Sequence, residues 1–177
     1  MKIILTKPGM EHKEQVLSFK KEMIENGDLS FHGCSGLEKV ETYEEWIDFE
    51  NRLSREYGES YVPSNLYLGI REDDGKLVGM IDCRTKLNDF LLTYGGHIGY
   101  SVRPTERRKG IAKTMLANLL DICKEEGFDK VLLTCDKINI GSQKTILAIG
   151  GVLENEIEDK VNLSDSGTIQ RYWINLK

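Results

Sequence analysis

Proline is scarce in this chain, and long hydrophobic runs are absent. There are only three prolines among 177 residues, and no Pro/Gly-rich linker divides the sequence. No apolar run approaches the roughly 18 residues that a membrane helix requires. The apolar stretch near the N-terminus is also too short for a signal peptide. We therefore expect a cytoplasmic protein with no membrane partner.

Clustered metal ligands are lacking as well. The four cysteines, Cys34, Cys83, Cys123 and Cys135, are widely spaced and form no C-x-x-C pair. The three histidines are equally scattered, whereas a zinc site needs closely spaced ligands. We predict reduced, mostly structural thiols and no metal.

Excess positive charge is missing too. The formal net charge is −5, with 24 Lys and Arg against 29 Asp and Glu. A general nucleic-acid binder needs a basic face, so this balance argues against that class. Hydrophobic residues make up 40% of the chain, enough to bury a core. The length suits a single domain over residues 1–177.

The apolar pattern predicts a mixed α/β protein with the order β-α-α-β-β-β-α-β-α-β-β. A capping box, Thr42 with Glu45, begins the second helix, and Asp73-Asp74-Gly75 is typical of a hairpin turn. The predicted elements are strand 3–5, helix 9–26, a helix from 42 to about 57, strands 66–71, 77–84 and 97–102, helix 111–126, strand 131–135, helix 142–149, and strands 152–158 and 168–176.

The most informative feature is the basic segment between the predicted strand 97–102 and the predicted helix 111–126. Residues 102–113 contain five cationic side chains and one glutamate, a local charge of +4. The N-terminus of a helix is already positive, so an anion bound to its free N–H groups is expected here. Gly110 would let such an anion approach the backbone closely. The alternative interpretation is a solvated basic turn.

The known nucleotide motifs fit this segment poorly. A P-loop needs glycine and G-K-[ST] where this chain has Arg107 and Ala112-Lys113-Thr114. The dinucleotide pattern G-x-G-x-x-G also fails. A nucleotide-binding protein that uses the same turn stays open as a third hypothesis.

The segment does match another pattern, R/Q-x-x-G-x-G/A, as Arg107-x-x-Gly110-x-Ala112. A second segment, Asn139-Ile140-Gly141-Ser142 followed by a short helix and Gly150, matches N-x-x-A/S…G. Together with the element order, these motifs resemble the GNAT superfamily of acetyl-CoA-dependent N-acetyltransferases. The resemblance covers residues 97–151 strongly and the whole chain in topology. It implies a GNAT-like mixed β-sheet flanked by helices.

The resemblance also implies a binding site for acetyl-CoA. Backbone N–H groups of the basic turn would hold the pyrophosphate, and a splayed strand would offer backbone groups to the pantetheine amides. Two residues of the second motif would hydrogen-bond the cofactor arm, although an N-cap role is the alternative for them. The implied cofactor-binding residues are Tyr100, Ser101, Val102, Arg107, Arg108, Lys109, Gly110, Ile111, Ala112, Lys113, Asn139 and Ser142.

The catalytic residues are harder to assign. The family often has a tyrosine seven residues after the asparagine, which acts as general acid, but Ile146 occupies that position here. A thiol with a pKa near ~8.5 can leave unprotonated, whereas an amine near ~10 must first lose a proton to a base. The candidate bases are His97, Asp136, Glu154 and Glu156. The candidate proton donors are Tyr172 and Cys135.

The sequence thus predicts transfer of an acetyl group from acetyl-CoA to a primary amine, by direct attack in a ternary complex. The acceptor, a small molecule or a peptide, would lie among residues 27–41, 57–65 and 85–96. Asp28, Glu59 and Asp89 could hold a cationic acceptor there. A homodimer is left open. The alternative function is a CoA-binding sensor or scaffold that has lost catalysis.

Overall fold

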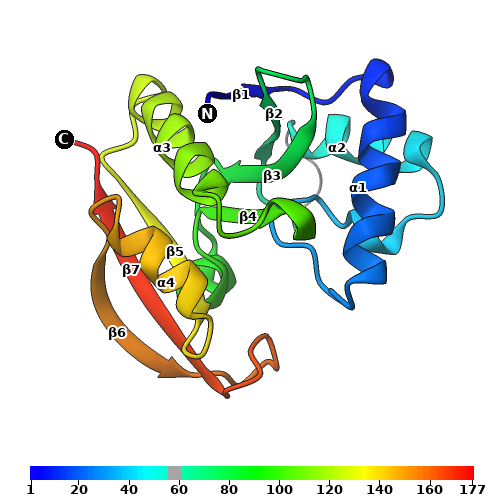
Figure 1. The fold of residues 1–177 in the computed structure, drawn as a ribbon. Coiled ribbons are helices and arrows are strands. Elements are labelled where there is room, and N and C mark those ends of the chain that lie inside the picture. The colour runs from blue at the N-terminus through cyan, green and yellow to red at the C-terminus, as the bar shows by residue number, and fades with distance from the viewer. Residues whose placement is uncertain (56–60) are drawn as a thin grey trace.

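The computed structural model describes residues 1–55 and 61–177, and its elements follow the predicted order (Figure 1). Short helical turns lie between the main elements, at Met10–His12, Leu37–Lys39, Leu91–Gly95 and Pro104–Glu106. The helices and strands are β1 (Ile3–Thr6), α1 (Lys13–Glu25), α2 (Tyr43–Leu53), β2 (Ser64–Arg71), β3 (Leu77–Arg84), β4 (Ile98–Val102), α3 (Ile111–Glu125), β5 (Lys130–Asp136), α4 (Ile140–Leu147), β6 (Val152–Glu158) and β7 (Thr168–Asn175).

The strands form two sheets. One has the order β1-β2-β3-β4 and the other β5-β7-β6, and every pairing within them is antiparallel. The α/β fold with flanking helices is confirmed. The strands separate where the resemblance implied a splayed strand, because among the described residues no ladder joins β4 to β5. Both strands are therefore sheet edges.

Helices cover both faces of the four-stranded sheet (Figure 1). α3 packs on one face, where Met115 and Leu119 meet Ile81 in a common core. α1 and α2 cover the other face, where Phe19 and Trp46 lie in a second core with Leu66 and Leu68. Side chains alternate between the faces of a strand, so one sheet can line both cores.

Some element ends differ from the prediction. α2 begins with the predicted capping box, since Thr42 Oγ1 accepts from the Glu45 N–H and Glu45 Oε2 accepts from the Thr42 N–H. It ends at Leu53, earlier than predicted, and the predicted end near residue 57 lies outside the described residues. The connection 85–96 is not irregular throughout, because Leu91–Gly95 forms a single wide helical turn.

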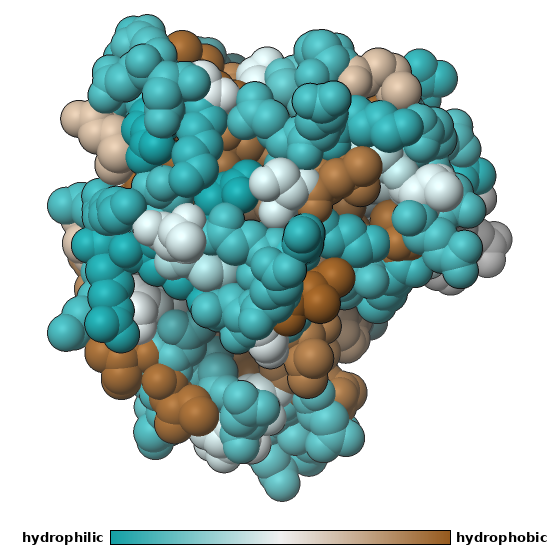
Figure 2. Space-filling model, turned by 45° about the vertical axis from the view of Figure 1, so that its right-hand side comes forward, coloured by the Kyte–Doolittle hydropathy of each residue, from teal (hydrophilic) through white to brown (hydrophobic). Residues whose placement is uncertain are grey.

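Hydrophilic residues predominate on the face in Figure 2, where apolar side chains form small separate groups. In the described part of the chain, no helix has both the length and the apolar character that crossing a membrane requires.

Candidate functional site

β4 and β5 touch at one end only. The His97 N–H donates to the Leu132 carbonyl (2.7 Å), and the Leu132 N–H donates to His97 Nδ1 (2.9 Å). The His97 ring also packs edge-on against Phe128 and Trp173. Beyond this contact the two strands form no further backbone hydrogen bonds with each other among the described residues. His97 therefore closes one end of a wedge between the sheets.

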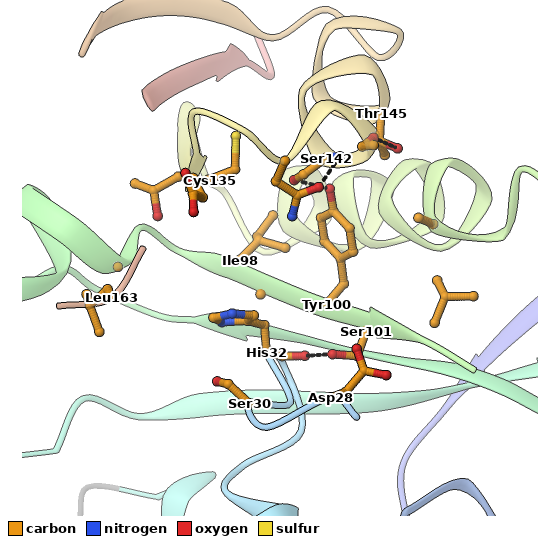
Figure 3. A pocket seen from close by; sticks show the side chains of 18 of the residues that line it. Asp28, Ser30, His32, Ile98, Tyr100, Ser101, Cys135, Ser142, Thr145 and Leu163 are labelled. Atoms are coloured by element: carbon orange, nitrogen blue, oxygen red, sulfur yellow. Dashed lines mark hydrogen bonds between the residues drawn. The ribbon is translucent and has the colours of Figure 1, made fainter. Parts of the chain in front are cut away.

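A cavity of about 700 Å³ occupies this wedge. Its walls come from β4, from the end of β5, and from the N-terminal ends of α3 and α4 (Figure 3). Eleven of the twelve predicted cofactor-binding residues line it, and Lys109 is the exception. The fold thus brings together two motifs that are about 30 residues apart in the sequence.

The register of β4 decides which backbone groups face the cavity. The Arg84 N–H donates to the His97 carbonyl and the Arg103 N–H donates to the Val78 carbonyl, so odd-numbered residues of this segment pair with β3. Tyr100 directs its N–H and C=O to the opposite side, away from β3. Ser101 does not, so the prediction that its backbone is open is wrong, because its own sheet uses those groups.

The N-terminus of α3 forms the other end of the cavity. Gly110 precedes the helix with a φ of +79°, and an added Cβ there would meet open space. No side chain caps the helix, so the N–H groups of residues 111–113 are available. Arg108 also has a positive φ, of +63°. Consecutive N–H groups in such a turn form a concave site that suits an anion.

The positive charge of this segment is smaller than the sequence suggests. Arg103 pairs with Glu22 (2.8 Å), Arg107 with Asp28 (2.9 Å), and Lys109 with a third carboxylate, that of Glu106 (3.0 Å). Arg108 and Lys113 form no ion pair with any described residue. The predicted local charge of +4 already includes Glu106, so the carboxylates of Glu22 and Asp28, both distant in the sequence, compensate half of it.

Glu106 holds the basic turn in place through three ion pairs. Its buried carboxylate accepts from Lys76, Arg71 and Lys109 at 2.7–3.0 Å. The hydrogen bond from Lys76, opposed by burial and supported by Arg71 and Lys109, lowers the pKa of Glu106 to about 2. The carboxylate is therefore ionised at neutral pH and holds the turn against β2 and β3.

Asn139 and Ser142 begin α4 at the cavity wall. Asn139 Oδ1 accepts from the Ser142 N–H (3.0 Å), so Asn139 is the N-cap that the alternative interpretation expected. The Ser142 hydroxyl lies 2.8 Å from the phenol of Tyr100, which points from β4 toward α4 (Figure 3). Burial raises the pKa of Tyr100 to about 12 despite this hydrogen bond. The sequence did not indicate that this phenol, in addition to the backbone, faces the cavity.

The side chain at the position of the family's tyrosine points into the core and not into the cavity. Ile146 is fully buried in the core below α4 and does not line the cavity. Its neighbour Thr145 does line it.

The prediction of His97 as a base is wrong. Its Nδ1 already accepts a hydrogen bond, and its ring lies outside the cavity. Burial and the positive charge of Arg84 lower the pKa of His97 to about 4. This side chain joins the sheets.

The predicted carboxylate bases are also occupied. Asp136 lines the cavity but accepts four hydrogen bonds, including two from Ser166. Burial opposes its ionisation, yet these hydrogen bonds lower the pKa of Asp136. Glu154 pairs with Arg171 and Glu156 with Lys137, and both lie outside the cavity. A carboxylate held in this way is a weak base.

The two predicted proton donors differ in position. The Tyr172 hydroxyl donates to Gln170 Oε1 (2.6 Å) and is buried away from the cavity, so this prediction is wrong. Cys135 lines the cavity at the end of β5. Burial raises the pKa of Cys135 to about 11. Its thiol is therefore protonated at neutral pH.

A histidine that the sequence did not indicate lines the cavity on the side opposite α4. His32 belongs to the loop 27–41, and its side chain also lines a second cavity of about 550 Å³. The two cavities share His32, Arg84, Phe90 and Leu91. The only available signal was the position of His32 in a loop predicted to surround the acceptor.

The carboxylates predicted to hold an acceptor do not cluster where the two cavities meet. Asp28 is paired with Arg107, and Asp89 lines neither cavity. Glu59 lies outside the described residues. The predicted loops 27–41 and 85–96 do contribute most of the second cavity's lining.

Comparisons with known proteins agree with this geometry. The family model described as Acetyltransferase (GNAT) family matches residues 31–150. A comparison with curated protein sequences gives no match.

Solved structures share the fold at low sequence identity. RimL, a ribosomal L7/L12 alpha-N-protein acetyltransferase in complex with coenzyme A, is 15% identical, with a TM-score of 0.73 over 98% of each chain. The microcin C7 self-immunity acetyltransferase MccE, in complex with acetyl-CoA and AMP, is 17% identical, with a TM-score of 0.70 over 98% of this chain and 92% of that one. An N-acetyltransferase from Staphylococcus aureus Mu50 is 17% identical, with a TM-score of 0.68 over the full length of both chains.

Proposed function

This chain belongs to the acetyltransferase (GNAT) family, and we propose that it transfers an acetyl group from acetyl-CoA to a primary amine, by direct attack in a ternary complex. The amine nitrogen bonds to the acetyl carbonyl carbon while the carbon–sulfur bond breaks. The sulfur leaves with the electron pair of that bond and ends as the thiol of CoA. One proton of an ammonium acceptor is released overall.

The observation that carries the proposal is the shape and polarity of the wedge between β4 and β5. At one end, the free N–H groups of residues 111–113 and the open backbone at Gly110 suit a pyrophosphate. Arg108 and Lys113 add positive charge beside them. In the middle, the unpaired backbone of Tyr100 suits the amides of a pantetheine arm.

Rate enhancement in such a site comes mainly from positioning. The edge of β4 holds the donor chain through backbone groups, so the carbonyl to be attacked has a fixed place in the wedge. N–H groups pointed at its oxygen would stabilise the negative charge that develops there. No metal is required for these steps.

Tyr100 is our candidate for the proton donor to the departing sulfur. Its phenol is directed into the cavity from β4 and reaches Ser142 at the start of α4. Ile146, at the position of the family's usual tyrosine, does not line the cavity. A donor is helpful but not essential, since a thiol with a pKa near ~8.5 is a tolerable leaving group.

The acceptor is a small molecule or a peptide with a primary amine, placed on the His32 side of the wedge. The related fold of RimL, an N-protein acetyltransferase, supports the peptide class, and that of MccE leaves small molecules equally open. The second cavity, which adjoins the first at His32 and Arg84, supports this placement of the acceptor.

The test uses Gly110→Glu and measures the melting temperature with and without acetyl-CoA. A ligand that binds the native state raises the melting temperature, so the wild type should show a positive shift. The variant should fold but lose this shift, because a carboxylate at Gly110 blocks and repels the pyrophosphate. Gly127→Glu is the matched control: it has a φ of +86° and open space, but lies at the other end of α3. Full retention of the shift by Gly110→Glu would contradict the proposed site.

A further inference from the structure

The acidic side chains of the first cavity are all engaged. Asp28 pairs with Arg107, Glu106 accepts from three cations, and Asp136 accepts four hydrogen bonds. None of the three has a carboxylate that is free to take a proton from an acceptor. The base that an alkyl ammonium needs must come from elsewhere.

His32 is the remaining side chain of the right basicity. It lines the cavity, and no described residue hydrogen-bonds to either nitrogen of its ring. His97, in contrast, lies outside the cavity and accepts a hydrogen bond at Nδ1. The ring is exposed within the cavity, so a proton that it accepts can pass to solvent.

The backbone around His32 is fixed to β4. The Ser101 hydroxyl donates to the His32 carbonyl (2.7 Å), and the next residue, Gly33, packs directly on the backbone of Gly99 and Tyr100. A Cβ at Gly33 would lie within 2.7 Å of the Tyr100 nitrogen. The loop therefore places His32 at the level of the strand where the wedge opens.

His32 and the Tyr100 phenol lie on opposite sides of β4 (Figure 3). Successive residues of a strand point to opposite faces. Tyr100 reaches α4, while Ser101 reaches the loop of His32. A thioester in the wedge would have the Tyr100 phenol on its sulfur side and His32 on the side open to the second cavity.

The charges that face His32 keep it neutral. Partial desolvation of the ring by the residues packed around it and the positive charge of Arg84 on β3 lower the pKa of His32, and the negative charges of Glu38 and Asp82 oppose them without reversing the shift. A neutral imidazole at pH 7 can accept a proton at once.

Resting on the proposed function, we propose that His32 is the general base, which takes the proton from the acceptor ammonium where the two cavities meet. The imidazole gains the proton and becomes imidazolium, and the freed amine nitrogen attacks the acetyl carbonyl. The second proton of that nitrogen passes to solvent as the carbon–sulfur bond breaks, and the departing thiolate takes a proton from Tyr100, which regains one from solvent. His32 then returns its proton to solvent.

The test compares His32→Gln with wild type, using two small amines in place of the unidentified acceptor. Propylamine is protonated at pH 7 and needs a base, whereas methoxyamine is already neutral. We expect kcat/KM for propylamine to fall by about 10²–10⁴-fold, the usual contribution of a general base, and kcat/KM for methoxyamine to fall much less. A merely structural loss would lower both equally.

The pH profile gives a second measurement. With wild type and propylamine, kcat/KM should rise with a midpoint below pH 6.5 and then reach a plateau, whereas in His32→Gln it should continue to rise toward the pKa of the amine near ~10. In the free protein, proton NMR of the His32 ring, assigned by its loss in the variant, should show a midpoint below 6.5. His12→Gln is the control, because His12 lines neither cavity.

The outcomes separate the two proposals. Acetyl transfer by wild type with equal loss for both amines, or with unchanged profiles in the variant, would overturn the assignment of His32 alone. No transfer by wild type to either amine would contradict the proposed function, and the base with it. An unchanged acetyl-CoA melting shift in His32→Gln confirms that the variant folds and binds the donor.

Discussion

The phenol of Tyr100 lies 2.8 Å from the hydroxyl of Ser142, and this hydrogen bond joins the edge strand β4 to the first turn of α4. The two residues are 42 positions apart in the sequence and meet only because the sheets diverge beyond His97. The bond fixes a half-buried, protonated phenol in the cavity wall, where the departing sulfur is expected. The proposed proton donation and the alkaline part of the pH profile both depend on this phenol.

Removing this hydroxyl should slow catalysis without preventing donor binding. We expect Tyr100→Phe to lower kcat about tenfold, below the usual range for a general acid because a thiolate is a good leaving group. Release of free CoA thiol measures the rate. Tyr67→Phe, a half-buried tyrosine on β2 outside the cavity, should behave as wild type. Equal rates for Tyr100→Phe and wild type would rule out this role for Tyr100.

The high pKa of Tyr100 predicts the alkaline side of the pH profile. Because burial raises that pKa to about 12, the phenol keeps its proton up to pH 10. The rate should therefore reach a plateau and show no descending limb between pH 8 and 10. A reproducible fall in that range, with folding and donor binding intact, would point to a different acid. Cys135 would then be the first residue to replace, because its thiol also lines the cavity.

Restoring the family's tyrosine at position 146 should not restore a catalytic group. Ile146 is fully buried, and a Cβ at Gly151 would already clash with its Cγ2 atom. We expect Ile146→Tyr to lower the free energy of unfolding by about 1–3 kcal/mol through overpacking, with no gain in kcat. Urea unfolding measures the loss. Thr145→Tyr, one position earlier and facing the cavity, is the comparison, and a stable and faster Ile146→Tyr would contradict the orientation of α4.

These cases show what the sequence could and could not reveal. The amphipathic period of residues 111–123 and the Thr42–Glu45 box are local signals, so they correctly predicted α3 and the start of α2. The basic turn was found in the same way. Its compensation by Glu22 and Asp28 was not, because those partners lie about 80 residues away.

The direction of individual side chains was the second feature that the sequence could not reveal. A motif fixes that Ile146 follows Asn139 by seven residues, but the direction of its side chain depends on how α4 packs on β5. The same applies to His97, whose intrinsic pKa suggested a base. Its burial between the sheets and the hydrogen bond at Nδ1 follow from long-range packing.

The Glu106 cluster predicts how stability depends on pH. Ionised Glu106 accepts from three cations, so Glu106→Gln should lower the free energy of unfolding at pH 7 by about 1.5–3 kcal/mol. The pKa of Glu106 is about 2 in the folded state against 4.5 for the free side chain. Its contribution is therefore full above pH 4.5 and is lost as the pH falls toward 2.

Urea unfolding of both proteins from pH 7 downward measures this difference. It should be constant to about pH 5 and then shrink. Glu72→Gln removes an exposed pair with Lys2 and should cost under about 1 kcal/mol at every pH. A difference between wild type and Glu106→Gln that stayed constant down to pH 3 would show that the cluster does not depend on ionised Glu106.

Amide hydrogen exchange with and without acetyl-CoA tests the binding site most directly. Bound donor should slow exchange at the N–H groups that the structure leaves unpaired in the wedge, those of Tyr100 and of residues 111–113. Amides paired within β2 and β3 should change little. Protection of these four amides, abolished in Gly110→Glu and retained in Gly127→Glu, is the result we predict. Unchanged exchange at the start of α3 under saturating acetyl-CoA would contradict the account.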